Sequence, residues 1–490
     1  MYDVVIVGAG VSGLTNALLL ARFGQRVAVV ERAAQVAPLL RGFNRWGVHF
    51  DTGFHYAGGM ADGEGLRRFF TFLGLERYLN IVSMRRDGFD RILSVNDSFQ
   101  CDLPVGPTAL INTLSAEFPV ERHAIERFVT DILQVSDYLP YLNVNMPTVN
   151  MSAFDVAGDI SLHTYLHRLT TNKKLRQVLS LHCILHGVAA DQVPLRFHAS
   201  VVGPYFRSAS TIAGGGVALA TAFEQCLSAA GVEFFCNEHV TKFHLSSQDE
   251  IAGVELADGR MLHCKTVVST LHPQQLLHCL PSRVFRPIYR KRLSCLRETT
   301  SACLLFASCR QPFDLLHGRN LYLIDQQQHV NSPFNDNLLY ITEAKGLGGA
   351  NKNGFMVISP SSTQDFTCWN DSRCGQRPTA YYAKKRNLSA QILQRLHQEV
   401  PSLADQIDHF ELATPLTLRD YMYSPDGALY GTQHQVDQYP LQAITRVKGL
   451  FISGQAVVAP GVMGAMSSAF YTSDTILGHE RLIGELKQCN

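Results

Sequence analysis

The stretch DVVIVGAGVSGLTNALLLARFGQRVAVVERA, residues 3–33, decides the fold. It begins with an apolar run over residues 3–7, which is typical of a buried strand, and a glycine-rich turn follows. A helical pattern then covers residues 13–23, Gly24 is placed to end that helix, and a second apolar run covers residues 26–30. The stretch therefore predicts a βαβ unit.

Three glycines in the turn of this unit, Gly8, Gly10 and Gly13, have the spacing G-x-G-x-x-G. Gly8 permits the turn, Gly10 lets a pyrophosphate approach the backbone, and Gly13 lets the helix pack closely on the strand. The start of the helix offers free N–H groups to phosphates. Glu31 ends the second strand, where a carboxylate binds ribose hydroxyls and disfavours a 2′-phosphate. The unit is predicted to bind a dinucleotide other than NADP.

The length and composition of the chain limit the classes of protein to which it can belong. A chain of 490 residues predicts two or three domains. Only 17% of its residues are charged, below the usual fraction of about 25%, and 46% are apolar. The net charge of +1 gives no electrostatic reason to expect nucleic-acid binding. No apolar run is long enough for a transmembrane helix, which leaves peripheral membrane contact open.

The cysteines and histidines do not form an evident metal site. The twelve cysteines contain no C-x-x-C pair, and with no secretory signal at the N-terminus they are expected to be reduced thiols of a cytoplasmic protein. His182 and His186 are four residues apart in a stretch, 173–188, that is expected to form one helix. No third ligand is evident near them, so we interpret them as pocket or core histidines and predict no metal.

Beyond the first unit, the segments FDTGFHY (50–56), GLFISGQ (449–455) and PGVMGAMSSAFYTSDTIL (460–477) stand out. Together they resemble flavoproteins of the group that includes phytoene desaturases, carotenoid isomerases and retinol saturases. FDTGFHY and SGQ lie nearest to the retinol saturase branch. The clear match covers about residues 1–60, 210–275 and 445–480. The resemblance implies FAD at the N-terminal unit and a long lipophilic polyene or isoprenoid as substrate.

The resemblance also implies which residues hold FAD. The backbone near Val240 lies beside the adenine in such proteins, and a helix that starts near Gly461 stabilises negative charge on the reduced flavin. Arg41 is either a partner of the pyrophosphate or a solvated loop arginine. The expected cofactor-binding residues are Gly8, Gly10, Val11, Ser12, Gly13, Glu31, Arg32, Arg41, Val240, Gly454, Gln455, Gly461, Val462 and Met463.

Two positions depart from the pattern of the family. A Gly-Gly pair usually follows the acid at the end of the second strand, and here Ala37-Pro38 stands in its place. An acid that binds the ribityl chain is usual in the C-terminal segment, and here that residue is Ala456. Both changes remove support for the cofactor, so we expect FAD to be bound somewhat loosely.

The stretch GVHFDTGFHYAGG, residues 47–59, supplies the candidate catalytic residues. We expect Asp51 and the glycines to shape a turn beneath the flavin ring, and His55 and Tyr56 to face the flavin or the substrate. His55 is the first candidate proton donor, because an imidazole titrates near neutral pH, and Tyr56 is the second. A hydrogen-bonded structural role for His55 is the alternative.

The chain is predicted to have an α/β fold with a discontinuous FAD-binding domain of the Rossmann type. Its three parts are residues 1–100, 206–275 and 441–490. Residues 101–205, mainly helical, and residues 276–440, with a sheet and helices, are expected to form an inserted α+β substrate domain. Tyr205 and Phe206 are expected to enter the substrate cavity from an extended stretch.

The predicted function is that of an FAD-dependent oxidoreductase acting on C=C bonds of a conjugated chain, with reduction favoured over desaturation or isomerisation. No second glycine-rich motif follows a strand, so NAD(P)H, if it donates electrons, enters the flavin cavity transiently. A lipid carrier of the same fold that has lost its flavin is the alternative. The sequence does not specify the oligomeric state.

Overall fold

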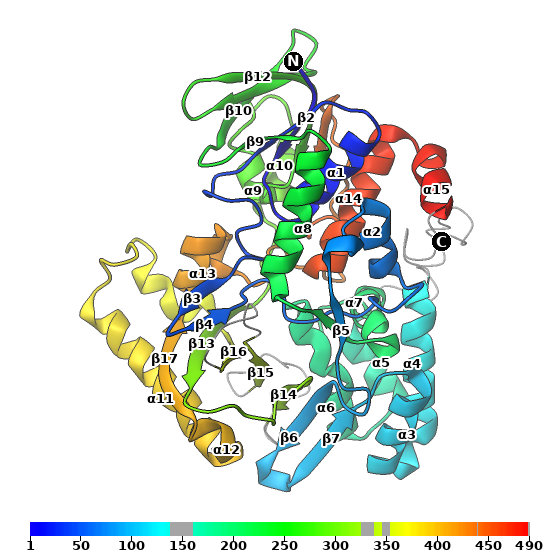
Figure 1. The fold of residues 1–490 in the computed structure, drawn as a ribbon, viewed down its shortest axis with the longest axis vertical. Helices are drawn as coiled ribbons and strands as arrows, with labels where there is room; N and C mark the ends of the chain where they lie inside the picture. The colour runs from blue at the N-terminus through cyan, green and yellow to red at the C-terminus, as the bar shows by residue number, and fades with distance from the viewer. Residues whose placement is uncertain (138–159, 325–337, 345–352, 439, 489–490) are drawn as a thin grey trace.

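The computed structural model describes residues 1–137, 160–324, 338–344, 353–438 and 440–488. Two large sheets lie one above the other along the long axis of the molecule in Figure 1. The upper sheet contains both the beginning and the end of the chain, and the lower sheet is built mainly from the middle of the chain.

The upper sheet is built around the predicted βαβ unit, which is confirmed as β1 (Tyr2–Val7), α1 (Val11–Arg22) and β2 (Val27–Val30). The strand order is β10-β11-β12-β1-β2-β9, and β18 pairs with β12. The pairs β12–β1, β1–β2, β2–β9 and β12–β18 are parallel. The added strands are β9 (Glu233–Phe235), β10 (Val240–Leu245), β11 (Ile251–Leu256), β12 (Met261–Ser269) and β18 (Leu450–Ile452). Three distant chain segments thus form one sheet, as expected for a discontinuous Rossmann-type domain.

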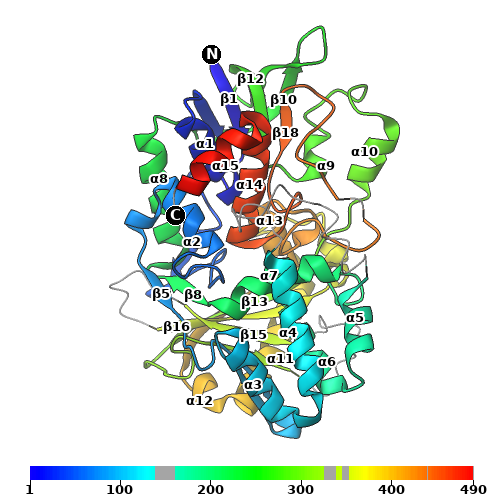
Figure 2. The same ribbon diagram turned by 90° about the vertical axis from the view of Figure 1, so that its right-hand side faces the viewer.

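Alternation along β1 assigns the two faces of this sheet. Val4 and Ile6 pack into a core shared with helices α1, α2 (Gly65–Leu73), α8 (Gly215–Ala229) and α14 (Gly461–Leu477). Val5 and Val7 point into the opposite core, with residues of the β10–β12 meander. Helices α9 (Pro273–Leu276) and α10 (Pro287–Ser294) cover that second core. Figure 2 shows α1, α14 and α15 (His479–Gln488) together near the first strand.

The lower sheet has the order β17-β13-β16-β15-β14-β6-β7. The long interior strand β13 is buried on both faces, which is why its sequence is mainly apolar. Its strands are β6 (Asp90–Ser94), β7 (Phe99–Leu103), β13 (Ser301–Cys309), β14 (Asn320–Leu323), β15 (Leu339–Glu343), β16 (Gly354–Ser361) and β17 (Ile407–Ala413).

Helices cover both faces of the lower sheet. Leu304 and Phe306 of β13 share a core with α3 to α7, while Leu305 and Ala307 share one with α11 and α12. The two groups of helices lie on opposite sides of the strands in Figure 1. These helices are α3 (Pro107–Glu117), α4 (Arg122–Asp137), α5 (Leu162–Leu169), α6 (Lys173–Ser180), α7 (Leu195–Arg207), α11 (Thr379–Glu399) and α12 (Pro401–Ala404).

Three local features differ from the sequence-based expectations. The strands β6 and β7 belong to the lower sheet, so the first part of the FAD-binding domain ends before residue 90 and not at residue 100. The stretch 173–188 is not one helix, because α6 ends at Ser180 and a 3₁₀-helix covers Leu181–Leu185. The stretch around Tyr205 is helical, with Pro204 inside α7. Part of the expected helical segment, residues 138–159, lies outside the described residues.

Candidate functional site

The glycine-rich turn between β1 and α1 leaves room for a phosphate. Gly8 has φ +101°, and a Cβ added to Gly13 would lie 2.0 Å from the carbonyl oxygen of Gly8. Those two positions therefore accept only glycine. Gly10 has no atom within 4 Å of the position that a Cβ would take, and it stands at the start of α1. The space above these backbone N–H groups fits the pyrophosphate of a dinucleotide.

Glu31 stabilises the same turn from the end of β2. Its Oε2 accepts a hydrogen bond from the backbone N–H of Ala9 at 2.7 Å, and its Oε1 accepts one from Ala33 at 2.8 Å. A carboxylate has lone pairs for about four hydrogen bonds, so both oxygens can still accept from ribose hydroxyls. Glu31 thus holds the turn and presents its charge at the expected position of the adenosine.

A buried polar network joins the N-terminal unit to the C-terminal segment. Ser12, in the first turn of α1 beside Val11, has its Oγ 2.8 Å from the Oγ of Ser453. Asn16 donates from Nδ2 to the same Ser453 oxygen at 2.9 Å and accepts from Ser473 of α14 at 3.0 Å. All four polar side chains are buried. The ends of the chain are therefore fixed against each other at the cofactor site.

Arg41 is not a solvated loop arginine, and its observed contacts are not with the glycine-rich turn. Its NH2 lies 2.6 Å from Glu224 Oε1 on α8, and its Nε donates to the Val36 carbonyl at 2.8 Å. The guanidinium therefore anchors the loop after β2 to α8. Its expected contact with the pyrophosphate stays a prediction.

Arg32 and Val240 flank the ends of the parallel strands. The guanidinium of Arg32 lies 4.0 Å from the ring centre of Tyr423. Val240 is buried at the start of β10, in the same core as Val7 and Val30, the last residues of β1 and β2. Both residues thus lie near the edge where a dinucleotide binds in such sheets, and their contacts with FAD stay predictions.

The C-terminal segment runs from β18 through a tight turn into α14. Gly454 has φ +118°, and its N–H donates to Ser468 Oγ at 2.8 Å. The carbonyl oxygen of Gln455 accepts a hydrogen bond from His434 Nε2 at 2.8 Å. The first turn of α14 then faces a cavity, which is lined there by Gly461, Val462 and Met463. This helix start can place a partial positive charge beside a ligand in the cavity.

The two departures from the family pattern have different structural consequences. Ala37 is buried with φ +52°, and its N–H donates to the Ala9 carbonyl at 2.8 Å. It thus keeps a left-handed backbone conformation that glycine adopts freely and that strains alanine by about 1–2 kcal/mol. Pro38 follows it and is exposed. Ala456 lines the cavity with a methyl group that offers no hydrogen bond.

Asp51 shapes the turn after β4 (Val48–Phe50). Its Oδ1 accepts a hydrogen bond from the N–H of Gly216 at 2.8 Å, in the first turn of α8. A Cβ on Gly215 would lie 2.4 Å from Asp51 Oδ2, so this approach requires glycine. The carboxylate therefore acts as a buried anchor at a helix N-terminus, which fixes the segment that carries His55 and Tyr56.

Both candidate catalytic residues line the cavity. His55 is half-buried, and its ring centre lies 6.4 Å from that of Tyr340. The hydroxyl of Tyr56 donates to Asp90 Oδ2 at 3.1 Å. Burial, followed by the charge of Asp90, raises the pKa of Tyr56 well above its ordinary value. Tyr56 therefore stays a neutral phenol at the wall of the cavity.

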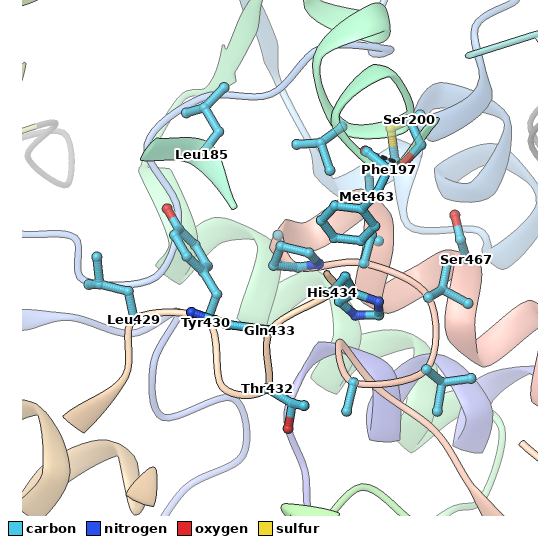
Figure 3. A pocket seen from close by; sticks show the side chains of 18 of the residues that line it. Leu185, Phe197, Ser200, Leu429, Tyr430, Thr432, Gln433, His434, Met463 and Ser467 are labelled. Carbon is cyan, nitrogen blue, oxygen red and sulfur yellow. Dashed lines mark hydrogen bonds between the residues drawn. The ribbon is translucent and has the colours of Figure 1, made fainter. Parts of the chain in front are cut away.

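The cavity lies between the two sheets and has a volume of about 720 Å³. Its walls come from the 53–58 loop, α7, the lower sheet, residues 429–438 and 440–442, and the start of α14. Arg196 and Asp437 are the only Arg, Lys, Asp or Glu side chains among its described lining residues. Figure 3 shows Phe197, His434 and Met463 grouped beside the helix start. Such an apolar cavity next to a cofactor site suits a lipophilic ligand.

Several residues of the cavity wall were not predicted from the sequence. Phe197 stacks on His434 with ring centres 4.3 Å apart, and Tyr340 and Tyr430 add further aromatic surface. Burial lowers the pKa of His434 and raises the pKa of Tyr430 to about 12, so both side chains are uncharged. These residues follow no motif, and tertiary folding alone brings them to the cavity. Of the two aromatics expected there, Tyr205 lines the cavity, whereas Phe206 packs in the core.

The histidines of the stretch 173–188 do not share a helix face. His182 lies in the 3₁₀-helix, and its Nε2 is 2.9 Å from Asp90 Oδ2. His186 follows that helix, and its Nε2 is 3.1 Å from His198 Nδ1 on α7. The change from α-helix to 3₁₀-helix after Ser180 rotates the two rings toward different partners.

A third side chain does lie close to His186, contrary to the sequence-based interpretation. Cys183, His186 and His198 are all buried, with their potential ligand atoms within 4.8 Å of one another. The backbone N–H of Val188 donates to His186 Nδ1 at 3.3 Å, which places the ring proton on Nε2. That proton is donated to His198, so neither atom offers a lone pair between the rings. The three side chains thus form a hydrogen-bonded cluster in this structure, and the expectation that they hold no metal stays a prediction.

Comparisons with known proteins show what the whole chain resembles. All-trans-retinol 13,14-reductase from Homo sapiens is 25% identical over 99% of this chain and 87% of its own length. Chloroplastic prolycopene isomerase from Arabidopsis thaliana is 24% identical over 97% of this chain and 83% of its own length. A solved oxidoreductase from Methanosarcina mazei, 15% identical, superimposes with a TM-score of 0.67, covering 95% of this chain and 98% of that one.

The family model supplies the assignment. The model described as flavin containing amine oxidoreductase matches residues 11–477, which include α1, the cavity and α14. The resemblance to retinol saturases and carotenoid isomerases is thereby confirmed, and FAD is the cofactor of this class of oxidoreductase. The turn at Gly10, the carboxylate of Glu31 and the start of α14 form a site that fits this cofactor. The chain belongs to the family of flavin-containing amine oxidoreductases.

Proposed function

We propose that this FAD-dependent oxidoreductase reduces a C=C bond in a lipophilic conjugated polyene or isoprenoid chain. The observation that carries the proposal is the apolar, aromatic cavity of about 720 Å³, which joins the start of α14 to His55 and Tyr56. A long apolar chain suits such a cavity, because only two of its described lining residues, Arg196 and Asp437, are Arg, Lys, Asp or Glu. The named activities of the retinol reductases and prolycopene isomerases concern molecules of this kind.

The chemistry requires a hydride and a proton. When bound, FAD supplies the hydride, and conjugation in the substrate spreads the charge that develops on the neighbouring carbons. His55 or Tyr56 supplies the proton, since both line the cavity. The aromatic walls of the cavity exclude water. The start of α14 stabilises negative charge on a group that lies beside this helix end. A reduced nicotinamide that enters the same cavity is our proposed electron donor.

Reduction, desaturation and isomerisation differ in the direction of hydride transfer. Desaturation would run the same steps in reverse, and isomerisation would return the hydride to the substrate. Reduction is favoured because relatives that are 25% identical to this chain are named reductases. A carrier without flavin is disfavoured because the family model describes flavin-containing proteins.

An anaerobic experiment tests the proposed reaction. Enzyme whose flavin has been reduced chemically is mixed with conjugated polyenes of several chain lengths and head groups. We expect the polyene absorbance to bleach while oxidised flavin reappears in equal amount. Isomerisation would change the polyene without flavin oxidation, and desaturation would require oxidised flavin at the start. Absence of any spectral change with every polyene would contradict the proposal.

We further propose that the protein contacts membranes from the cytoplasmic side. Lipophilic substrates of this kind dissolve in membranes. Among the described residues, no helix is both long enough and apolar enough to cross a bilayer. The residues 281–297, here called the basic segment, contain six Arg or Lys residues and no Asp or Glu. The exposed Ile288 of α10 lies among them, and Leu296 of the same segment lines the cavity. Basic residues beside an exposed apolar one suit an anionic lipid surface.

Sedimentation with lipid vesicles tests this contact. Replacing Arg286 and Lys291 by serine should weaken binding to vesicles containing phosphatidylserine about 10- to 30-fold, because each basic residue near such a surface contributes about 1 kcal/mol. The matched control removes Lys384 and Arg386 from α11, and it should leave binding unchanged. Equal losses in both variants would indicate general charge attraction and no specific surface.

A further inference from the structure

A buried cluster of polar side chains lies directly behind Tyr56. The hydroxyl of Tyr56 is 3.1 Å from Asp90 Oδ2 and 3.1 Å from the hydroxyl of Tyr322. Asp90 Oδ2 also lies 2.9 Å from His182 Nε2, and Asp90 Oδ1 accepts from Asn320 Nδ2 at 2.8 Å. Tyr56 is the only one of these five residues that lines the cavity. Tyr56 therefore belongs both to this cluster and to the wall of the cavity where the substrate is proposed to bind.

The negative charge of the buried Asp90 carboxylate has to be compensated by a proton. Its side chain has an exposed fraction of 0%, and no Arg or Lys is among its hydrogen-bond or ion-pair partners in the described chain. A buried carboxylate without a cation is costly, and the imidazole of His182 is the one partner that can carry a positive charge. Asp90 and His182 therefore hold one proton between them, and the pair is neutral as a whole.

Tyr56 can give up its proton only if another replaces it at once. Burial, followed by the Asp90 charge, raises the pKa of Tyr56 well above its ordinary value, so an isolated phenolate is strongly disfavoured. The Asp90–His182 pair touches the same hydroxyl and holds the proton that is needed.

We propose that Asp90 and His182 store the proton that Tyr56 delivers to the substrate carbon during alkene reduction, an inference that rests on the proposed function. The O–H bond of Tyr56 breaks as the new C–H bond forms. The phenol oxygen regains a proton from Asp90 Oδ2, and Asp90 takes one from His182 Nε2. Water returns a proton to the pair before the next turnover. No electron moves in these steps, because the electron pair arrives with the hydride. Tyr56 is the catalytic residue, and Asp90 and His182 are positioning residues.

The test compares Tyr56→Phe, Asp90→Asn and the double variant of the holoenzyme, each with a conjugated polyene at saturation. General acids contribute about 10²- to 10⁴-fold, so we expect kcat to fall about 100-fold or more in each single variant. KM and flavin content should stay unchanged. Because both residues act on one proton, the double variant should be no slower than the slower single variant.

A matched control separates this role from a structural one. Asp102→Asn replaces the neighbouring aspartate on β7, which pairs with Arg91 at 2.6 Å and does not line the cavity. It should keep kcat within a factor of two. Multiplicative losses in the double variant, or a kcat for Asp90→Asn equal to that of Asp102→Asn, would overturn the proposal. A large loss in His55→Gln with full activity in Tyr56→Phe would overturn it too.

A measurement without substrate makes the test independent of the reaction. The shared proton between His182 Nε2 and Asp90 should give a downfield proton NMR signal in the wild-type protein and in Tyr56→Phe. The signal should vanish in Asp90→Asn and, if that variant does not fold, in His182→Gln. Absence of the signal from the wild-type protein contradicts the proton store whatever the activity. A clear signal in a protein that reduces no polyene instead contradicts the proposed function.

Discussion

The Gly13→Ala variant is expected to purify without flavin and to unfold at a lower temperature than the wild-type protein. The new Cβ would lie 2.0 Å from the carbonyl oxygen of Gly8 and 3.4 Å from Ile6 Cγ2. Backbone atoms cannot yield as a flexible side chain can, so α1 must move away from β1. We expect a loss of about 3 kcal/mol in the free energy of unfolding. Flavin absorbance after gel filtration and a thermal melt measure the two effects.

Gly484→Ala is the matched control for this prediction. Gly484 lies inside α15, and no atom is within 4 Å of the position of its added Cβ. Alanine stabilises a helix interior by about 0.5–1 kcal/mol relative to glycine. That variant should keep its flavin and melt at the same or a slightly higher temperature. A Gly13→Ala protein with full flavin content would mean that the turn does not hold the pyrophosphate.

Replacing Glu31 by alanine should weaken FAD binding at least about 100-fold. The carboxylate accepts hydrogen bonds from Ala9 and Ala33, and the proposed ribose contact adds another. Hydrogen bonds to charged groups contribute about 1.5–3 kcal/mol each, and 1.4 kcal/mol corresponds to a tenfold change in affinity. Equilibrium dialysis of the apoprotein against FAD measures the dissociation constant directly.

Two further substitutions calibrate this prediction. Glu31→Gln keeps one acceptor without the charge and should lose less affinity than Glu31→Ala. Ala456→Asp adds an acid at the cavity wall and should tighten binding about 10- to 100-fold at most, because it adds one charged hydrogen bond. If Glu31→Ala retains its full flavin content through dialysis, the adenosine site has been assigned to the wrong residue.

The parts of the molecule that follow local rules were predictable from the sequence. The alternation of β1, the glycine spacing and the terminal Glu31 each depend on neighbours within one βαβ unit, and all appear as expected. The helix and strand that follow Gly214 also agree, as α8 and β9. In these segments the hydrophobic pattern and the backbone conformations that require glycine suffice to specify the structure.

The parts set by contacts distant in sequence were not predictable. The sequence of β6 reads as a continuation of the first domain, and only its parallel pairing with β14 assigns it to the lower sheet. Tyr340 and Tyr430 reach the cavity from separate segments with no motif of their own. The helix through Tyr205 persists despite Pro204, because Gly203 lets α7 pack closely on α4 near Ser136. Such tertiary packing overrides local preference.

The bond between Ser12 and Ser453 also sets the order of events during biosynthesis. A ribosome releases β1, α1 and β2 before the strands of the lower sheet, and it releases β18 and α14 after them. The nascent chain can form its early glycine-rich turn, but the wall of the cavity that the start of α14 supplies does not yet exist. Stable loading with FAD must therefore wait until translation has passed α14, so the cofactor cannot template the folding of the segments that are synthesised before this helix.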